Sequence, residues 1–199
     1  MVEDQLTSPE DDEKTRPPVS ALRFDTSAEL FAEMSQLREL IQLRPEAEES
    51  GLDFLHRLAE SATPEDAVTF TAFAAQPKMA VWWGYECLRN LRSDFSHADR
   101  ELLEMIAHWS ANGETALRYR IMQIALFSEH RTAAVMLGLA AGWSGQQIAP
   151  NDPAPIPAGR APRAVNAAVL SALAQCHLAN RPLHLKKLVT LSEPLFRGF

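Results

Sequence analysis

Two histidines and two glutamates, His97, Glu101, Glu104 and His108, recur at helical spacing in the middle of the chain. Offsets of 4, 7 and 11 residues place all four on one helix face, and both residue types bind metal ions. At the helical rise, however, the two histidines lie roughly 16 Å apart along the axis, which is too far to share one ion. We interpret the stripe as a solvent-exposed face opposite the apolar side of the same helix, and we predict no metal ligands.

A serine between two glycines is the next candidate for chemistry, in Gly142-Trp143-Ser144-Gly145. The turn that carries a nucleophilic serine in many hydrolases has the pattern Gly-x-Ser-x-Gly between a strand and a helix. Here one residue is missing and the segment follows an apolar helical stretch. We therefore predict that a helix ends at this point, with Gly145 as its C-terminal cap, and we assign no catalytic residue.

The adjacent tryptophans Trp82 and Trp83 lie within one apolar segment. Neighbouring residues on a helix point about 100° apart, so the two rings cannot both point into one core. We expect one ring to anchor the core and the other to lie at a helix–helix contact or on the surface. An exposed tryptophan is a candidate anchor for a partner, because tryptophan is enriched at binding hot spots.

A long proline-rich segment follows Trp143 and Ser144. Residues 145–162 contain five prolines, and alternating prolines favour a stiff, extended chain. Long loops of this kind are uncommon in compact domains and are often functional. Two interpretations stay open, a packed crossover between two helices and a segment that docks a partner. The candidate partner-binding residues are Trp82, Trp83, Trp143, Pro153, Pro155 and Pro157.

Composition sets the limits of the molecule. A chain of 199 residues with 46% hydrophobic residues is typical of one soluble domain with a substantial core. Residues 1–16 hold six acids and two bases, so they carry much of the formal net charge of −7. We predict a disordered acidic tail over residues 1–20 and a single helical domain over residues 21–199. The nearly neutral domain lacks the basic face of a nucleic-acid-binding protein.

The cysteines and the apolar runs indicate the compartment. Cys87 and Cys176 lie far apart in apolar, helical surroundings, where we expect reduced, buried thiols. No apolar run approaches the roughly 18 residues of a membrane span. The first residues do not have the basic-then-apolar pattern of a secretory leader, so we expect a cytoplasmic protein.

Helical periodicity runs through the chain from residue 25 onward, and no window alternates as a strand does. We predict an all-α fold, a compact array of about eight or nine short helices with a proline-rich connection between the last helices. Ser27, Thr63, Ser96 and the pair Asn112-Gly113 are the predicted cap signals. The expected helices cover residues 27–43, 51–61, 64–75, 77–92, 96–109, 114–127, 131–143, 161–179 and the segment from 182 onward.

Three segments together resemble an uncharacterised family of small, all-helical proteobacterial proteins. They are residues 77–83 with Ala-Val-Trp-Trp, residues 132–150 with the Trp-Ser-Gly stop into the proline loop, and residues 162–170 with Arg-Ala-Val. The chain departs from the family pattern at residues 146–148, where Gln-Gln-Ile replaces Gly-Ser and a hydrophobic residue. The resemblance covers residues 75–175. It implies proteins encoded near type VI secretion genes, with an accessory role and no catalytic residues.

These observations favour a non-enzymatic protein-interaction or scaffolding module that has no cofactor. Its expected partner is a protein, for which a component of the type VI secretion system is one candidate. One alternative is a small-molecule-binding or enzymatic protein with a pocket near Trp82 and Trp83, which would use Glu86, Cys87 and His108. A metal-binding helical protein is the third hypothesis. The chemistry of the residues alone does not decide whether the protein is an enzyme.

Overall fold

The fold of the described residues is built from helices throughout. The computed structural model describes residues 21–92, 94–152 and 154–197, and within them there are ten α-helices, one 3-10 helix and no strand. The helices are α2 (Ser27–Glu33), α3 (Leu37–Leu40), α4 (Gly51–Ala59), α5 (Asp66–Ala74), α6 (Pro77–Leu91), α7 (His97–Asn112), α8 (Thr115–Phe127), α9 (Ala133–Trp143), α10 (Arg160–Ala174), η1 (Leu178–Asn180) and α11 (Arg181–Arg197).

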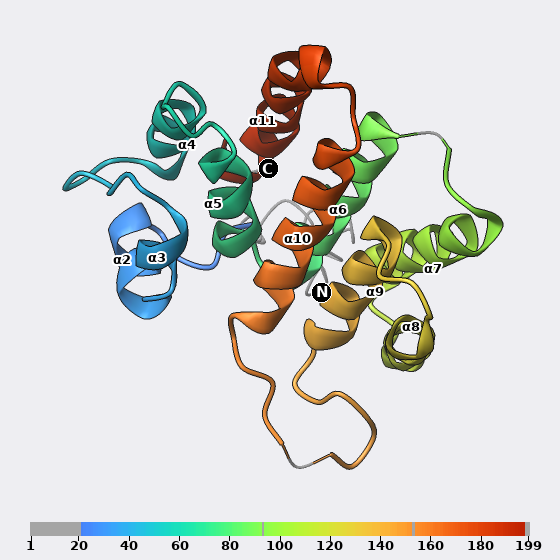
Figure 1. The fold of residues 1–199 in the computed structure, drawn as a ribbon. Coiled ribbons are helices and arrows are strands. Elements are labelled where there is room, and N and C mark those ends of the chain that lie inside the picture. Colours follow the sequence, from blue (N-terminus) through green and yellow to red (C-terminus); the bar gives the residue numbers. More distant parts are fainter. Residues whose placement is uncertain (1–20, 93, 153, 198–199) are drawn as a thin grey trace, which may run out of the picture.

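The predicted all-α class is therefore confirmed. Nine of the ten α-helices have seven or more residues, and α3 is a single turn. The proline-rich connection lies between α9 and α10, as predicted, and projects from one end of the molecule (Figure 1). The expected disordered tail of residues 1–20 lies outside the described residues.

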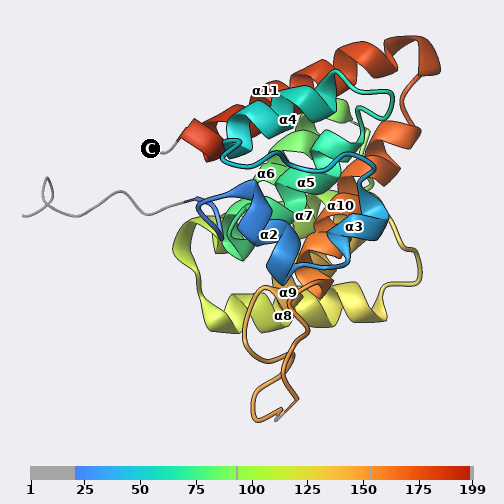
Figure 2. The ribbon, with the colours of Figure 1, turned by 90° about the vertical axis from the view of Figure 1, so that its left-hand side faces the viewer.

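The helices form stacked layers around α5, α6 and α10. In Figure 2, α4 and α11 cover one side of this centre, and α8 lies across the opposite side. The helix α10 packs against α9, α6 and α5, and α8 packs against α9 and α7. Because α9 consists largely of alanine, glycine and leucine, its neighbours can approach it closely.

The helix α5 is the centre of the core, since every one of its residues is buried. At the middle of this helix, Phe54 and Phe70 meet edge to face with ring centroids 4.9 Å apart, and Phe196 of α11 stacks on Phe70 at 5.4 Å. These rings join the consecutive helices α4 and α5 to α11, which is distant from them in sequence. Aromatic pairs of this geometry add about 1 kcal/mol each beyond the burial of their area.

The predicted single helix over residues 27–43 is wrong, because the chain turns between α2 and α3. Leu30, Met34, Leu37 and Ile41, which share the expected apolar spacing, are all buried, but α2 ends at Met34, which has φ −104° and ψ 65°. The turn places the Gln36 side chain against Gly159 at the far end of the proline loop. Thr26, not Ser27, is the N-cap of α2, in a capping box with Glu29.

The predicted hydroxyl cap at Thr63 is also wrong. The helix α5 begins three residues later, after a turn in which the Asp66 N–H donates to the Thr63 carbonyl at 2.9 Å. The Thr63 hydroxyl donates instead to the buried carboxylate of Asp66, at 2.9 Å, and the backbone N–H of Gln42 donates to the same oxygen at 3.1 Å. Asp66 needs these donors because a buried carboxylate without partners is costly.

The predicted cap signals of α7 are confirmed. Ser96 caps α7 by accepting from the Asp99 N–H, and Gly113 ends the helix with a left-handed φ of 75°. Beyond the proline loop, α10 ends at Ala174, five residues before the predicted end, and η1 separates it from α11. Among the helices described, none combines the length and the apolar character that crossing a bilayer requires.

Candidate functional site

The two adjacent tryptophans take different environments. Trp83 is 2% exposed in the core, whereas Trp82 is 39% exposed on the surface of α6. The Trp82 ring lies 5.3 Å from the Tyr85 ring, one turn further along the helix. This division follows from the angle between neighbouring helical residues, and it leaves Trp82 as the accessible member of the pair.

The residues proposed to share a pocket with the tryptophans diverge. Cys87 is fully buried, and burial, followed by the charge of Glu86, raises the pKa of its thiol well above the ordinary value. His108 is exposed on α7, where its imidazole lies 3.7 Å from the Glu114 carboxylate. A buried thiol and a solvent-exposed imidazole do not form a nucleophile–base pair. Both cysteines are free thiols, as predicted, although Cys176 is only half-buried.

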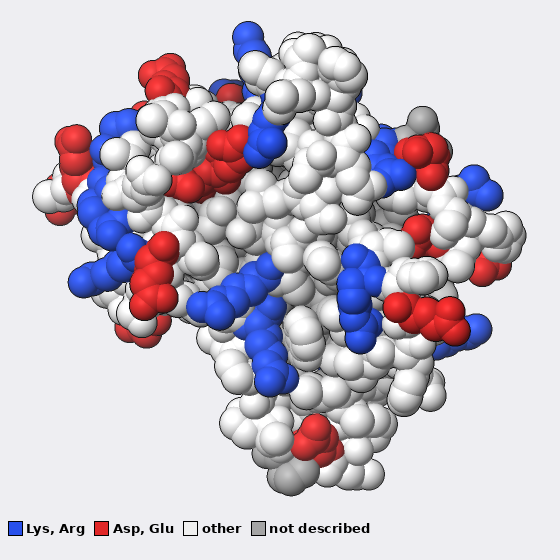
Figure 3. Space-filling view, in the orientation of Figure 1, with Lys and Arg blue, Asp and Glu red and all other residues white. Residues whose placement is uncertain are grey.

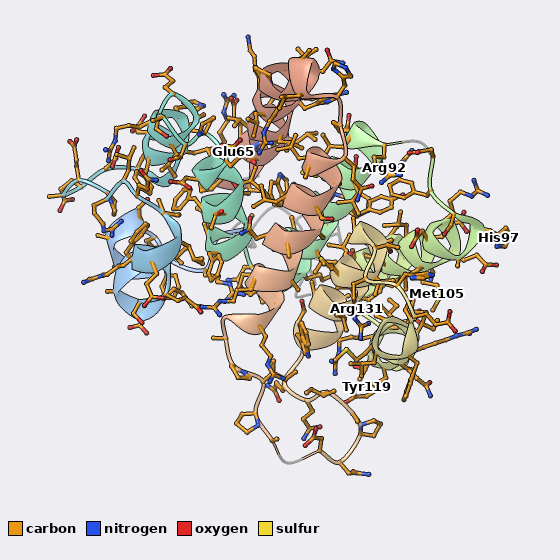
Figure 4. All side chains as sticks on the ribbon, in the orientation of Figure 1. Glu65, Arg92, His97, Met105, Tyr119 and Arg131 are labelled. Carbon is orange, nitrogen blue, oxygen red and sulfur yellow. The ribbon has the colours of Figure 1, made fainter. Side chains whose placement is uncertain are left out.

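The polar stripe on α7 also faces solvent, as its position opposite the core predicts. The His97 and Glu101 side chains are exposed and lie 3.5 Å apart, and His97 points away from the molecule (Figure 4). Glu104 and His108 continue the exposed stripe. Within the described residues, no group of three or more histidine, cysteine, aspartate or glutamate side chains is arranged to hold a metal ion.

The proline connection begins at Trp143 and runs over the surface. Trp143 is half-buried under the guanidinium of Arg160, which lies 5.6 Å from the ring centroid. Ser144 continues the helix geometry and donates its hydroxyl to the Ala140 carbonyl at 2.7 Å. Pro155 and Pro157 are exposed, and Pro153 lies outside the described residues. The lower end of the molecule, formed by this loop, bears few charged side chains (Figure 3).

A groove of about 670 Å³ lies between α8 and the start of the proline loop. Tyr119 lies on the side of α8 that faces the loop (Figure 4). The groove walls are largely apolar, with Arg120 and Gln123 as the polar members on the helix. The other residues that line it are Ala116, Tyr119, Met122, Leu126 and Phe127 of α8, and Ile148, Ala149 and Pro150 of the loop.

The helix α8 carries exposed apolar side chains in addition to its buried face. Ile121 and Ala125 are buried against the core, yet Phe127 is 81% exposed and Ile124 is 41% exposed. The helical spacing of Leu117, Ile121 and Ile124 predicts one buried apolar stripe. That prediction is only partly correct, since Ile124 is exposed and Leu117 is half-buried. A helix that is hydrophobic all round is expected to be covered on every side. Among the described residues, the outer face of α8 has no helix over it.

A buried arginine holds the loop wall of the groove in place. Arg118 of α8 is 6% exposed, and its Nη1 donates to the carbonyls of Gly142 at 2.6 Å and Gln147 at 2.9 Å. Among the described residues it has no carboxylate partner. Its charge lies instead at the C-terminal end of α9, where the helix dipole is negative. Arg118 therefore ties α8 to the end of α9 and to the first residues of the loop.

Gly142 and Gly145, on either side of Trp143 and Ser144, allow this close packing. Gly145 was predicted as the C-terminal cap of the helix, which is wrong, because Ser144 occupies that position. Gly145 does not have a positive φ. A Cβ at Gly145 would lie 2.3 Å from the Arg118 Cζ, so the missing side chain makes room for the guanidinium. A Cβ at Gly142 would lie 2.3 Å from the Met122 Sδ. Glycine is required here by close approach and not by backbone conformation.

Sequence reasoning did not identify Arg118 or the groove. Arg118 binds carbonyls 24 and 29 residues away, and no local pattern encodes such contacts. The outer face of α8 did leave a signal. Nine of the twelve residues from Ala116 to Phe127 are alanine, methionine, aliphatic or aromatic, which is more than one buried face of a surface helix needs.

The comparisons with known proteins add one match. Residues 54–195, well over half of the chain, match the model of a family of unknown function (DUF6931). The matched range includes α8, the proline loop and the groove between them, and it leaves out α2 and α3. No curated protein and no solved structure matches the chain significantly.

Proposed function

Because the chain belongs to the DUF6931 family, whose function is unknown, we propose a role from its own surface: a non-enzymatic protein-interaction module that docks a partner in the α8 groove. The single observation that carries this proposal is the second apolar face of α8, with Phe127 almost fully exposed. Leaving such side chains in water forgoes roughly 2 kcal/mol per large residue. Contiguous apolar patches on soluble proteins commonly mark binding sites.

The shape of the groove favours an amphipathic helix as its occupant. Its residues on α8 run from Ala116 to Phe127, which at the helical rise is about 16 Å, or three turns. A partner helix with apolar residues at i, i+3 or i+4, and i+7 presents a stripe of the same length. Arg120 is the one charged residue among the groove walls, so an acidic residue on the partner helix would lie beside it.

A groove with a fixed wall binds more tightly than a mobile one, because less conformational freedom is lost on binding. Arg118 fixes the wall formed by Ile148, Ala149 and Pro150 through its bond to the Gln147 carbonyl. Proline at position 150 restricts the backbone further. Further candidate contacts lie outside the groove. They are Trp82 on α6 and the exposed Pro155 and Pro157 in the proline loop.

The partner is the finer part of the proposal. The resemblance of residues 75–175 to proteins encoded near type VI secretion genes suggests a component of that apparatus, which would place the module in a bacterial cytoplasm as an accessory protein. The near-neutral body of the chain favours a protein partner over a nucleic acid.

The test is site-specific photo-crosslinking in the native host. A photoreactive residue at Gln123, in the groove, is expected to capture a discrete partner, whereas the same residue at Lys187, which is exposed on α11, is not. Phe127→Ser should abolish the adduct, and it should weaken binding of the purified partner about tenfold or more, since an aromatic anchor contributes 2 kcal/mol or more.

Equal capture from both positions, or binding that survives F127S unchanged, would contradict the groove as the docking surface. A crosslink to a second copy of this chain, with a matching dimer in light scattering, would replace the partner helix by self-association. The identity of the captured protein decides the secretion context separately.

A further inference from the structure

A second cleft lies between α6 and α7, on elements that do not contribute to the α8 groove. Its volume is about 420 Å³, which falls within the range of small-molecule sites. In contrast to the groove, its lining combines cationic and aromatic side chains. The helix α6 contributes Tyr85 and Arg89, and Arg92 directly follows it. Phe95 lies between α6 and α7, and α7 contributes Arg100 and Glu104.

Two of the three guanidiniums in this cleft are available to a ligand. Arg89 and Arg100 are exposed, and among the described residues neither has a carboxylate partner. Arg92, at the end of α6 in Figure 4, is held by Asp94 through bonds of 3.0 and 3.1 Å. Those bonds lower the pKa of the Asp94 carboxyl, so the pair is ionic near neutral pH. Glu104 is the one acidic residue that lines the cleft, so the lining as a whole keeps an excess of positive charge.

The aromatic rings are arranged together with these cations. The Arg89 guanidinium lies 5.5 Å from the Tyr85 ring centroid, and its Nη1 is 3.4 Å from the Tyr85 hydroxyl. The Arg92 guanidinium lies 5.8 Å from the Phe95 ring centroid. Trp82 extends the aromatic surface, because its ring is 5.3 Å from Tyr85. Flat surfaces beside unpaired guanidiniums suit a ligand that has both an anionic group and a ring.

We propose that the α6–α7 cleft binds a small phosphate monoester that carries a flat ring. Arg89 and Arg100 take the phosphate, whose two charges match their two, and the ring lies against Tyr85 and Phe95. Guanidinium groups bind phosphate oxygens through paired N–H donors, which a single ammonium group cannot reproduce. This site is independent of the partner groove, so either proposal can fail without the other.

The test is isothermal titration of the full chain with four probes: phenyl phosphate, adenosine monophosphate, glycerol phosphate and inorganic phosphate. The two ring-bearing probes are expected to bind more tightly than the two without a ring. Arg89→Gln and Arg100→Gln should each weaken the binding of phenyl phosphate about tenfold, since each removes charge-assisted hydrogen bonds to the phosphate. Arg163→Gln, on α10, removes an exposed arginine that lies in neither the cleft nor the groove, and it should leave binding unchanged.

Tyr85→Leu separates the two halves of the proposal. This variant should weaken the binding of phenyl phosphate, and it should leave the weaker binding of inorganic phosphate unaltered. Equal affinities for the ring-bearing and ring-free probes would overturn the aromatic part. Affinities that persist in the R89Q/R100Q double variant, or the absence of binding by all four probes at low ionic strength, would overturn the site. Because both arginines are exposed, circular dichroism of the variants should match that of the unmodified chain.

Discussion

Arg118 illustrates how one side chain can organise a surface that it does not itself form. It is buried and charged, and its hydrogen bonds run to the end of one helix and to the loop beyond it. Buried charges are tolerated only when donors and acceptors compensate them. Here the compensation comes from backbone carbonyls, so the guanidinium acts as a side-chain cap for α9 and as a tether for the loop.

Replacing Arg118 by methionine should therefore destabilise the protein by about 2 kcal/mol, because two carbonyls lose their charged donor. Gly145→Ala should act in the same direction, since the added methyl group displaces the same guanidinium. Urea unfolding measures both changes. Because the two variants remove one shared contact, the double variant should cost less than the sum of the single ones. Additive losses would show that Gly145 acts independently of Arg118, and the exposed Arg120→Met provides the control.

At the level of the elements, the contact between α8 and α9 depends on small residues. A Cβ at Gly142 would meet the Met122 Sδ, Cβ and Cγ at 2.3 to 2.8 Å, whereas one at Gly138 would meet the Ala125 Cβ at 3.1 Å. The first contact cannot be relieved by rotation alone, because it includes the Cβ of Met122. Close packing of α8 therefore sets the position of the groove.

Gly142→Ala and Gly138→Ala form a matched pair for this contact. Alanine gains about 1 kcal/mol of helix propensity over glycine at either position. At Gly142, overpacking of about 1–3 kcal/mol should exceed this gain and lower the melting temperature. At Gly138 the smaller overlap should leave stability nearly unchanged. Thermal unfolding followed by circular dichroism compares the two, and equal melting temperatures would contradict the close approach at Gly142.

The sequence predicted which elements are helical because apolar spacing reports the face that is buried. It could not predict where a helix is interrupted when both parts bury the same face. Leu30, Met34, Leu37 and Ile41 are all buried as the period requires, although the chain turns at Met34. The two tryptophans were separated correctly for the same geometric reason. Arg118, Gly145 and the groove were out of reach because they depend on contacts between distant segments.

At the scale of the whole molecule, the buried thiol of Cys87 reports on global unfolding. Its side chain is fully buried in the core, and burial raises the pKa of the thiol above the ordinary value of 9.0. The thiol therefore stays protonated at pH values at which an exposed cysteine already forms the reactive thiolate. Cys176 is half-buried, with weak contacts from its Sγ to the carbonyls of Leu91 and Ala172. The two thiols should therefore differ widely in reactivity.

In a Cys176→Ala variant, a thiol reagent at pH 8 should modify the remaining cysteine only as fast as the molecule unfolds. The rate should rise with urea in parallel with the loss of helical circular dichroism. The matched Cys87→Ala variant should react faster in the absence of urea. Rapid modification of Cys87 in native buffer would mean that the core around α6 opens locally.

The central position of α5 has a consequence for how the protein is made. Its residues are covered in part by α10 and α11, which come much later in the chain. During synthesis on the ribosome, α5 emerges long before the helices that shield it, so its apolar sides stay uncovered until α10 and α11 have been translated. Such a nascent chain is exposed to aggregation, and it is the kind of client that chaperones protect.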